Sequence, residues 1–559
     1  MLPASVHNGR GQVLQTQGRH AEAIAEFKKA IALTPNDWGA YNNIAGSLKT
    51  LHRYADALTY YMRALRLEPT SPAILHNLAS LLGTVDRNEE ALLIIRKCLR
   101  HHPGALQLLA SLVPILKAQC AWHDLESAEQ LLIELTEHQL NNRMLPTAAA
   151  FTFHTLSISR ELKLRIAKAT AAKYKMAAHL MPGLSISFEH RGKGERLRVG
   201  YLSPDFRAHS AGGAFLSLMK EHTHERFEFF AYGTTPVTGD YVTGELVEHF
   251  DHFWDVSEAS FMDVARLISN DGINILVDLA GHTGGATLEV LALRPAPVQC
   301  HYLGYSDTTG ADYIDYLITD WEQFPEGEEH YATERLVRLP QSFMPASIGT
   351  PSPECTSRGD HSLPKSGFVF ANFAGSNKHH PTMFRVWANI LRRVPHSVLW
   401  LLKSNALQEP NIRAFFGELG VAPPGRIVFA SIAAHGKHLE RMNHVDLALD
   451  TLPHSGGVTT VDALSMGVPI LTMRGDTPQG RNGASILMGL PNYVANTLNE
   501  YEEKAVNIAL RGRPKRIEAK NLPVFNTKRL ARHIEWAYER MWEMRETPQR
   551  IDVPDLGGG

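Results

Sequence analysis

Apolar and polar positions in the first part of the chain recur at a fixed interval. The repeated positions are small residues and prolines spaced 34 residues apart: Ala23, Ala57 and Ala91, then Pro35, Pro69 and Pro103. Small residues at fixed places let two antiparallel helices approach closely, and a proline ends the second helix of each pair. Residues 1–138 are therefore predicted to form an array of helix pairs, with a degenerate last unit around residues 122–137.

An interval of 34 residues is that of the tetratricopeptide repeat. Arrays of this repeat form an α-solenoid whose concave groove normally receives a peptide. Asn43 and Asn77 lie one repeat apart on the same predicted helix face, where their amides can hold the extended backbone of an acceptor. The alternative is that both asparagines only pack helices together. Because repeats alone predict only binding, a scaffold without activity is a second hypothesis.

Residues 139–195 also have a helical pattern, with apolar anchors such as Phe151 and Leu156, and they end in the polar stretch RGKGE. A polar break that contains glycine is typical of a domain boundary. We therefore expect a helical linker that docks the solenoid on the rest of the chain.

After this break the pattern changes to short apolar runs, each followed by a polar loop and a helix-like run. Strands that alternate with helices predict parallel sheets covered by helices on both faces. The pattern divides into two Rossmann-like α/β halves at 196–345 and 367–525, joined by a linker at 346–366. A long amphipathic helix and tail at 526–559 can cross back to brace the first half. The predicted fold class is thus an α-solenoid followed by two α/β domains.

In the first half, several titratable residues and one leucine–glycine pair lie in the loops that follow the predicted strands. They are His209, Asp240, His282 and the pair Leu303 and Gly304. In a parallel sheet such residues meet beyond the carboxyl ends of the strands. Histidine is a common general base near neutral pH, so His209 is a candidate base, whereas Asp240 and His282 are candidates for acceptor binding or proton relay. The alternative for each loop histidine is a structural role.

The second half contains the stretch GVTTVD, which is predicted to begin a helix. Its expected phosphate donors are backbone N–H groups and hydroxyls of Gly457, Val458, Thr459 and Thr460. A helix N-terminus is a natural seat for phosphate oxygens. Asp462 is placed to accept hydrogen bonds from ribose hydroxyls, or merely to favour the helix dipole. Lys378, after the first strand of this half, can neutralise a diphosphate.

The charge balance, the cysteine spacing and the length of apolar runs argue against several other classes of protein. The chain has 56 basic and 58 acidic residues, without the basic excess of a nucleic-acid binder. Its four cysteines form no CxxC pair, which argues against a zinc or disulfide framework. There is no run of about 18 apolar residues and no secretory signal pattern. The expected location is the cytoplasm, with neither nucleic acid nor membrane as a partner.

The absence of three sequence motifs further limits the cofactors and metal ions that the protein is expected to use. The Walker sequence GxxxxGK[ST], the dinucleotide fingerprint GxGxxG and the metal-associated DxD are all absent. We therefore expect no cofactor and no metal ion. The charge of a departing diphosphate must then be met by Lys378 and by donors at a helix end, since fixed dipoles in a dry cleft can replace an ion.

Several long segments resemble the O-GlcNAc transferase family, whose members move N-acetylglucosamine from UDP-GlcNAc to serine and threonine. The most telling segments are DFRAHSAGG, DGINILVDLAGHTGG, LRPAPVQCHYLGYSDTTG and DLALDTLPHSGGVTTVDAL. The likeness covers nearly the full length and implies tetratricopeptide repeats followed by two halves of the GT-B type. The short repeat array is similar to that of a bacterial homologue.

The resemblance also implies roles for single residues. His209 matches a histidine of the active-site loop, and Lys378 matches the lysine that contacts the donor diphosphate. Thr459 and Asp462 match the phosphate and ribose contacts. Further matches lie near the uracil, the ribose or the sugar: Ala433, His438, Leu303 and Gly304. His435 departs from the family's lysine near the uracil, and SGGVTT replaces a tract close to NGHTTG, so donor contacts are expected to differ.

The activity implied by the resemblance is an inverting, metal-independent transfer of N-acetylglucosamine. UDP-GlcNAc is the expected donor substrate, and serine or threonine hydroxyls of proteins held in the solenoid groove are the expected acceptors. Three alternatives stay open: another UDP-hexose as donor, an asparagine acceptor, or a tetratricopeptide scaffold whose catalytic region has decayed.

Overall fold

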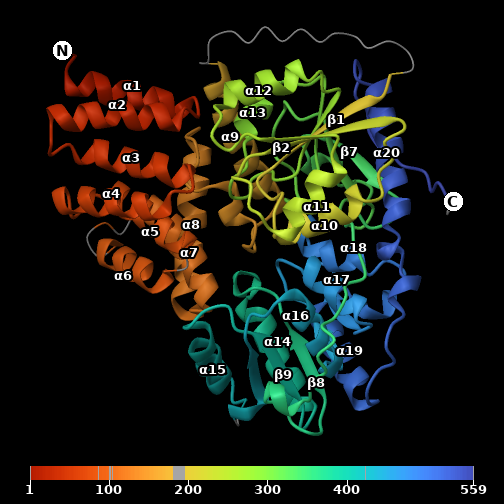
Figure 1. Ribbon diagram of the computed structural model, residues 1–559. Helices are drawn as coiled ribbons and strands as arrows, with labels where there is room; N and C mark the ends of the chain where they lie inside the picture. Colours follow the sequence, from red (N-terminus) through yellow and green to blue (C-terminus); the bar gives the residue numbers. More distant parts are fainter. Residues whose placement is uncertain are drawn as a thin grey trace.

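The computed structural model describes residues 2–85, 87–99, 102, 105–179, 195–421 and 424–557. They form a helical solenoid and two α/β halves, which confirms the predicted fold class (Figure 1). In Figure 1 the solenoid lies at the left, the N-terminal half at the upper right and the C-terminal half below it. In the described part of the chain, no helix combines the length and the apolar character needed to cross a membrane.

The solenoid consists of consecutive antiparallel helix pairs. Its helices are α1 (Ala4–Thr16), α2 (His20–Leu33), α3 (Trp38–Thr50), α4 (Tyr54–Leu67), α5 (Pro72–Thr84), α6 (Asn88–Leu99), α7 (Leu106–Gln119) and α8 (Trp122–Asn141). The repeated alanines Ala23, Ala57 and Ala91 are completely buried. Only small side chains fit where two helices approach this closely. Pro35 and Pro69 follow the ends of α2 and α4 as predicted, and Pro103 lies outside the described residues.

The last helix pair docks on the C-terminal half. The Trp122 ring at the start of α8 lies 4.5 Å from the Phe384 ring and 4.7 Å from the Phe415 ring. Asn411 donates a hydrogen bond to the Gln119 carbonyl oxygen at 2.9 Å. The sequence of this pair departs from the repeat because its outer surface is an interface.

A connector joins the solenoid to the N-terminal half. It contains the 3-10 turn η1 (Ala150–Phe153) and helix α9 (Arg160–His179), separated by a non-helical segment. The expectation of a helical stretch over 139–195 is thus met only in part. The predicted boundary at RGKGE lies almost entirely outside the described residues, which resume at Glu195.

The N-terminal half is a parallel sheet. Its strands are β1 (Leu197–Ser203), β2 (Phe227–Gly233), β3 (His252–Asp255), β4 (Ile275–Asp278), β5 (Val298–His301), β6 (Tyr316–Asp320) and β7 (Arg335–Leu339), with β14 (Ile551–Asp552) at one edge. Their order is β14-β7-β6-β5-β4-β1-β2-β3. The covering helices are α10 (Ser210–Met219), α11 (Tyr241–His249), α12 (Phe261–Asn270) and α13 (Leu288–Ala292). The strand order reverses between β1 and β4, and in such sheets ligands bind at the carboxyl ends of the strands at this switch point.

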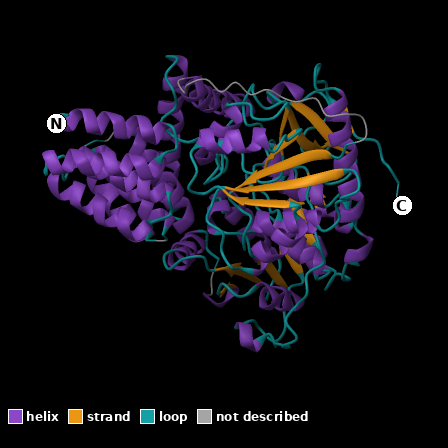
Figure 2. Ribbon diagram, turned by 45° about the horizontal axis from the view of Figure 1, so that its top comes forward, coloured by secondary structure: helices purple, strands orange, loops and turns teal. Residues whose placement is uncertain are grey.

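The C-terminal half repeats this topology. Its strands are β8 (Val369–Asn372), β9 (Val398–Leu402), β10 (Ile427–Ala430), β11 (Leu447–Leu449), β12 (Ile470–Met473) and β13 (Val494–Ala495), in the order β10-β9-β8-β11-β12-β13. Its helices are α14 (Pro381–Arg393), α15 (Gln408–Glu418), α16 (His435–Arg441), α17 (Val458–Ser465), α18 (Asn482–Ile486) and α19 (Leu498–Leu510). The fanned strands of both sheets are seen in Figure 2. Here the switch point lies between β8 and β11.

The end of the chain returns to the N-terminal half. Helix α20 (Thr527–Glu543) runs along that half, and β14 pairs with β7 (Figure 1). The Tyr538 and Tyr201 hydroxyls are hydrogen-bonded at 2.9 Å, and Glu535 lies 3.1 Å from His222. The two halves are therefore joined both by the linker and by this returning segment.

Candidate active site

The switch point of the C-terminal sheet carries a half-buried lysine. Lys378 ends the 3-10 turn η4 (Ser376–Lys378) after β8, and its Nζ donates to the Ser455 carbonyl oxygen, 3.4 Å away, in the loop after β11. Burial lowers the pKa of Lys378, and the Asp450 carboxylate opposes that shift. Lys378 thus lies at the switch point of this sheet, and its expected contact with a diphosphate stays a prediction.

Asp450 fixes the loop that Lys378 touches. The carboxylate accepts hydrogen bonds from the Gly456 N–H and the Thr472 hydroxyl, both at 2.7 Å, and from the Ser455 hydroxyl. These bonds hold residues 450–456 against β12. Sequence reasoning missed Asp450, although its place directly after the buried run LAL was a signal that it ends a strand at the cleft.

Helix α17 begins without a side-chain cap. Its N-cap residue is Gly457, which has no side chain to bond the first N–H groups of the helix. A Cβ atom at the preceding Gly456 would lie 2.6 Å from the Thr460 hydroxyl and 2.9 Å from the Thr459 hydroxyl. The turn is therefore tightly packed and keeps its N-terminal dipole available for an anion. In the first turn of α17, Thr460 is completely buried, whereas Val458 and Thr459 are partly accessible.

Asp462 lies between two histidines of α16. Its carboxylate is 3.0 Å from His435 Nε2 and 3.7 Å from His438 Nε2. The hydrogen bond to Asp462 raises the pKa of His435, whereas burial and the nearby Arg441 lower the pKa of His438 to about 4. Ala433 is exposed just before α16. The residues expected around the uracil and ribose therefore lie close together. In this structure His435 binds the Asp462 carboxylate.

His209 and Asp240 each cap a helix in the N-terminal half. His209 Nδ1 accepts from the Ala211 N–H at 3.3 Å, and 44% of its side chain is exposed. Asp240 accepts from the Thr243 N–H at 3.0 Å. Burial acts to raise the pKa of Asp240, but hydrogen bonds from Thr238 and its neighbours outweigh burial and lower the pKa to about 2. The Asp240 carboxylate is thus held ionised at the start of α11, and its role in acceptor binding or proton relay stays a prediction.

His282 is buried beneath the loop after β5. Its Nε2 lies 2.8 Å from the Thr309 carbonyl oxygen, and burial lowers its pKa to about 4. The ring contacts Tyr305 edge to face at 5.3 Å. His282 therefore supports this loop as a neutral N–H donor. Its Nε2 is used in this backbone contact, and the role of His282 in acceptor binding or proton relay stays a prediction.

Leu303 and Gly304 belong to that loop. Leu303 has a left-handed backbone with φ of 73°. A Cβ atom at Gly304 would lie 2.1 Å from the Leu279 carbonyl oxygen. Only glycine permits this approach, which brings the loops after β4 and β5 together at the switch point of the N-terminal sheet.

A histidine that the sequence did not single out lies where both halves and the connector meet. The His154 ring is 4.6 Å from the Tyr305 ring and 4.9 Å from the His454 ring. His154 is 4% exposed, and its Nδ1 is buried without a hydrogen-bond partner. Burial first, and then the cations Lys163 and Lys378, hold its pKa well below the usual range. It is an unprotonated imidazole close to Lys378.

Buried donors fix the His154 backbone. Gln479 Nε2 donates to the His154 carbonyl oxygen at 3.0 Å, and Lys163 Nζ donates to the same atom at 3.4 Å. Lys117 of the solenoid donates to the Thr155 carbonyl oxygen at 3.1 Å. Burial lowers the pKa of Lys163 to about 8, against the opposing charge of Asp307. Solenoid, connector and C-terminal half thus position one imidazole together.

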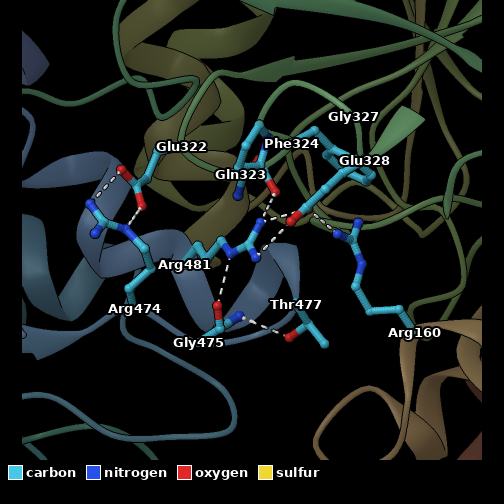
Figure 3. Close-up of polar contacts among 12 residues, drawn as sticks. Arg160, Glu322, Gln323, Phe324, Gly327, Glu328, Arg474, Gly475, Thr477 and Arg481 are labelled. Atoms are coloured by element: carbon cyan, nitrogen blue, oxygen red, sulfur yellow. Dashed lines mark hydrogen bonds and ion pairs between the residues drawn. The ribbon is translucent and has the colours of Figure 1, made fainter. Parts of the chain in front are cut away.

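An ion-pair network joins the connector to both α/β halves (Figure 3). Glu328 of the N-terminal half binds Arg160 of α9 and, at 2.7 Å, Arg481 of the C-terminal half. Arg474 pairs with Glu322 beside it. The network fixes how the two halves face each other, and hence the width of the cleft.

Comparison with known proteins identifies the family. The sequence profile described as glycosyl transferase family 41 matches residues 119–351 and 346–530, and tetratricopeptide profiles match residues 4–37 and 39–71. The chain belongs to glycosyl transferase family 41. The predicted repeats and the resemblance stated from the sequence are thereby confirmed.

Named relatives of this family 41 chain include two curated proteins. A probable UDP-N-acetylglucosamine–peptide N-acetylglucosaminyltransferase (SEC) of Arabidopsis thaliana is 33% identical over 469 residues, which are 79% of this chain and 48% of that protein. The UDP-N-acetylglucosamine–peptide N-acetylglucosaminyltransferase of Caenorhabditis elegans is 26% identical over 560 residues, covering 78% of this chain and 49% of that protein. The chain thus matches about half the length of each.

A solved structure supports the whole architecture. A mutant of the Thermobaculum terrenum O-GlcNAc transferase superposes with a TM-score of 0.67 at 25% sequence identity, covering 97% of this chain and 98% of that one. The solenoid and both halves of this family 41 chain therefore have counterparts along nearly their full length.

Proposed function

We propose that the protein transfers N-acetylglucosamine from UDP-GlcNAc to serine or threonine hydroxyls of protein acceptors, with inversion and without a divalent ion. The observation that carries the proposal is the meeting of Lys378 with the uncapped N-terminus of α17 at the switch point of the C-terminal sheet. The names of the relatives point to the same donor and to a peptide acceptor.

The donor is placed by the C-terminal half. The uracil lies against the exposed segment at Ala433, and Asp462 binds the ribose hydroxyls once His435 turns aside from its carboxylate. The diphosphate lies on the first turn of α17, where the helix dipole and free N–H groups favour negative charge. The sugar then points toward Leu303 and Gly304 of the facing half.

Lys378 stabilises the leaving diphosphate. Its charge is half-buried, and a cation in such a site interacts more strongly with developing negative charge than one in water. The contact strengthens as the sugar–phosphate bond breaks, so it lowers the barrier more than it tightens donor binding. This arrangement supplies the charge that a divalent ion provides in other sugar transferases.

His154 is placed to take the acceptor proton. A serine hydroxyl is a weak nucleophile at neutral pH and needs a base or precise positioning. His154 is unprotonated there and has an unpartnered Nδ1. A bound diphosphate brings negative charge near the imidazole, which raises its pKa toward the range useful for a base. The exposed His209 is the second candidate, since it borders the same cleft.

Donor and acceptor panels test the proposal against its alternatives. The protein is incubated with radiolabelled UDP-GlcNAc, UDP-glucose or UDP-galactose, and with peptides that carry serine, threonine or asparagine. We expect label from UDP-GlcNAc on hydroxyl peptides, unaffected by a Mg²⁺ and Mn²⁺ chelator. Label from another hexose or on asparagine would replace the proposal, and absence of UDP binding by calorimetry would indicate a scaffold with a decayed site.

A further inference from the structure

Three potential metal ligands lie together beside the linker between the halves. They are His361 and His444, through a ring nitrogen each, and the Glu440 carboxylate; their ligand atoms lie within 4.8 Å of one another. Glu440 is buried and the two histidines are half-buried. The donor and acceptor roles described above use none of the three.

A fourth oxygen completes the group. The Thr356 hydroxyl lies 2.8 Å from His361 Nε2, 2.9 Å from His444 Nε2 and 2.7 Å from the Glu440 carboxylate. Four ligands at about 2.0 Å from a tetrahedral zinc ion are about 3.3 Å apart. The three Thr356 contacts, at 2.7–2.9 Å, are shorter than this value, so the hydroxyl has to move outward, and the other three ligand atoms lie within 4.8 Å of one another. Small side-chain shifts thus give a tetrahedral site.

The local fold brings these ligands together for simple reasons. Glu440 in α16 and His444 in the following turn η6 (Met442–His444) are four residues apart, which places them on one helix face. His361 comes from the linker and packs on the Trp400 ring at 5.0 Å. Glu440 also accepts from the Thr356 N–H at 2.9 Å, so the linker is already held at this point.

The chemistry of the donors selects the ion. Metal ligation requires neutral imidazoles and an ionised carboxylate. The ligand atoms of all three groups face the Thr356 hydroxyl at 2.7–2.9 Å, so they already point toward one another. Two imidazoles and a carboxylate are a zinc donor set, whereas Mg²⁺ and Ca²⁺ prefer oxygen ligands alone.

We propose that His361, Glu440 and His444, with Thr356 in the fourth position, bind a zinc ion that fastens the linker to α16. This site is separate from the diphosphate and takes no part in the transfer step. The start of α16 carries His435 and His438, which flank Asp462. Zinc therefore fastens the linker to the C-terminal end of α16, away from these two histidines.

Zinc content and thermal stability of the full chain test the proposal. The protein is stripped with a chelator, incubated with Zn²⁺ and desalted, and its zinc is measured by mass spectrometry. We expect one zinc per chain and a rise in Tm of about 2 °C at zinc concentrations roughly 100-fold above Kd. His361→Gln and Glu440→Gln should lose both effects while releasing UDP from UDP-GlcNAc at the wild-type rate.

The matched control is His396→Asn, which changes an exposed histidine of the same half. It should bind zinc like the wild type, because this residue lies outside the group. The proposal is overturned if the wild type keeps no zinc after desalting, or if His361→Gln and Glu440→Gln keep as much as the control. The second result would assign the zinc to other surface histidines.

Discussion

The ammonium of Lys378 and the carbonyl oxygen of Ser455 meet across the switch point of the C-terminal sheet, 3.4 Å apart. The bond is long, and its acceptor is a neutral carbonyl, so the lysine keeps most of its hydrogen-bonding capacity. A diphosphate on the first turn of α17 would replace this weak partner by a charged one. Such charge-assisted bonds are roughly twice as strong as neutral ones.

Replacing Lys378 by alanine should therefore lower kcat strongly and KM little. We expect a loss of about 10²–10³ in kcat, because the charge acts mainly on the breaking bond. The measurement is UDP release from UDP-GlcNAc, with circular dichroism to verify folding. Lys520→Ala, at an exposed position of the same half, is the control and should leave the rate unchanged. A folded Lys378→Ala variant with normal kcat would refute the assignment.

His154→Gln and His209→Gln separate the two candidate bases. Glutamine keeps polar bonding but takes up no proton, so the true base should lose about 10²–10⁴ in peptide glycosylation. We expect that loss for His154, which is buried beside Lys378, and a smaller one for the exposed cap His209. Initial rates with saturating donor and a serine peptide decide between them. The reverse order would return the role to His209.

Periodicity was enough to predict the solenoid, and alternating strands and helices were enough to predict two Rossmann-like halves. Three edge strands carried no such signal: β3 is mostly exposed and lacks a buried apolar run, and β13 and β14 have only two residues each. β14 is also paired through a long-range return of the chain. Its partner, β7, is distant in sequence, so no local pattern indicates it.

The candidate site also contains residues that the sequence could place and residues that it could not. Lys378 and Asp462 follow strands or begin helices, so local pattern and resemblance placed them. His154 lies in a short turn of the connector, and its environment is made by Tyr305 and His454 from two other domains. Asp240 looked available for chemistry in the sequence, yet its carboxylate is occupied by a helix N-terminus. Such roles depend on tertiary contacts that one sequence does not display.

Burial of Lys163 should make stability depend on pH. Its pKa is about 8 in the fold and 10.5 in an ordinary lysine, so between these values the unfolded chain binds more protons. The contribution of Lys163 to stability therefore rises with pH across this window, and below pH 8 the buried charge costs about 3 kcal/mol. We expect the Tm of Lys163→Met to exceed that of the wild type by less at pH 10 than at pH 7.

The control for this pH effect is Lys168→Met, one turn further along α9 on the exposed side. Because Lys168 is exposed to solvent, its Tm difference from the wild type should not change with pH. A pH-independent difference for Lys163→Met as well would show that this lysine is not desolvated.

The asparagines of the solenoid should affect protein acceptors only. Asn43 Nδ2 donates to the Asn8 side chain at 3.3 Å, and Asn77 Nδ2 donates to the Asn42 side chain at 3.1 Å, so amides of adjacent repeats form a ladder. Replacing Asn43 and Asn77 by alanine together should reduce protein glycosylation and spare hydrolysis of UDP-GlcNAc. Both rates are measured with Tm as the folding check, and equal loss of both would indicate a structural role.

Arg481 of the C-terminal half binds Glu328 of the N-terminal half and should stabilise the contact between the two halves. Its guanidinium donates to the Gly475 carbonyl oxygen at 2.8 Å and to Glu328 at 2.7 Å, with 11% of the side chain exposed. Arg481→Met leaves Glu328 short of a partner and should cost about 3 kcal/mol. The matched Arg474→Met removes the more exposed pair with Glu322 and should cost less than about 1 kcal/mol. Unfolding curves and proteolysis of the linker compare the two, and equal losses would show that burial does not decide the strength of this interface.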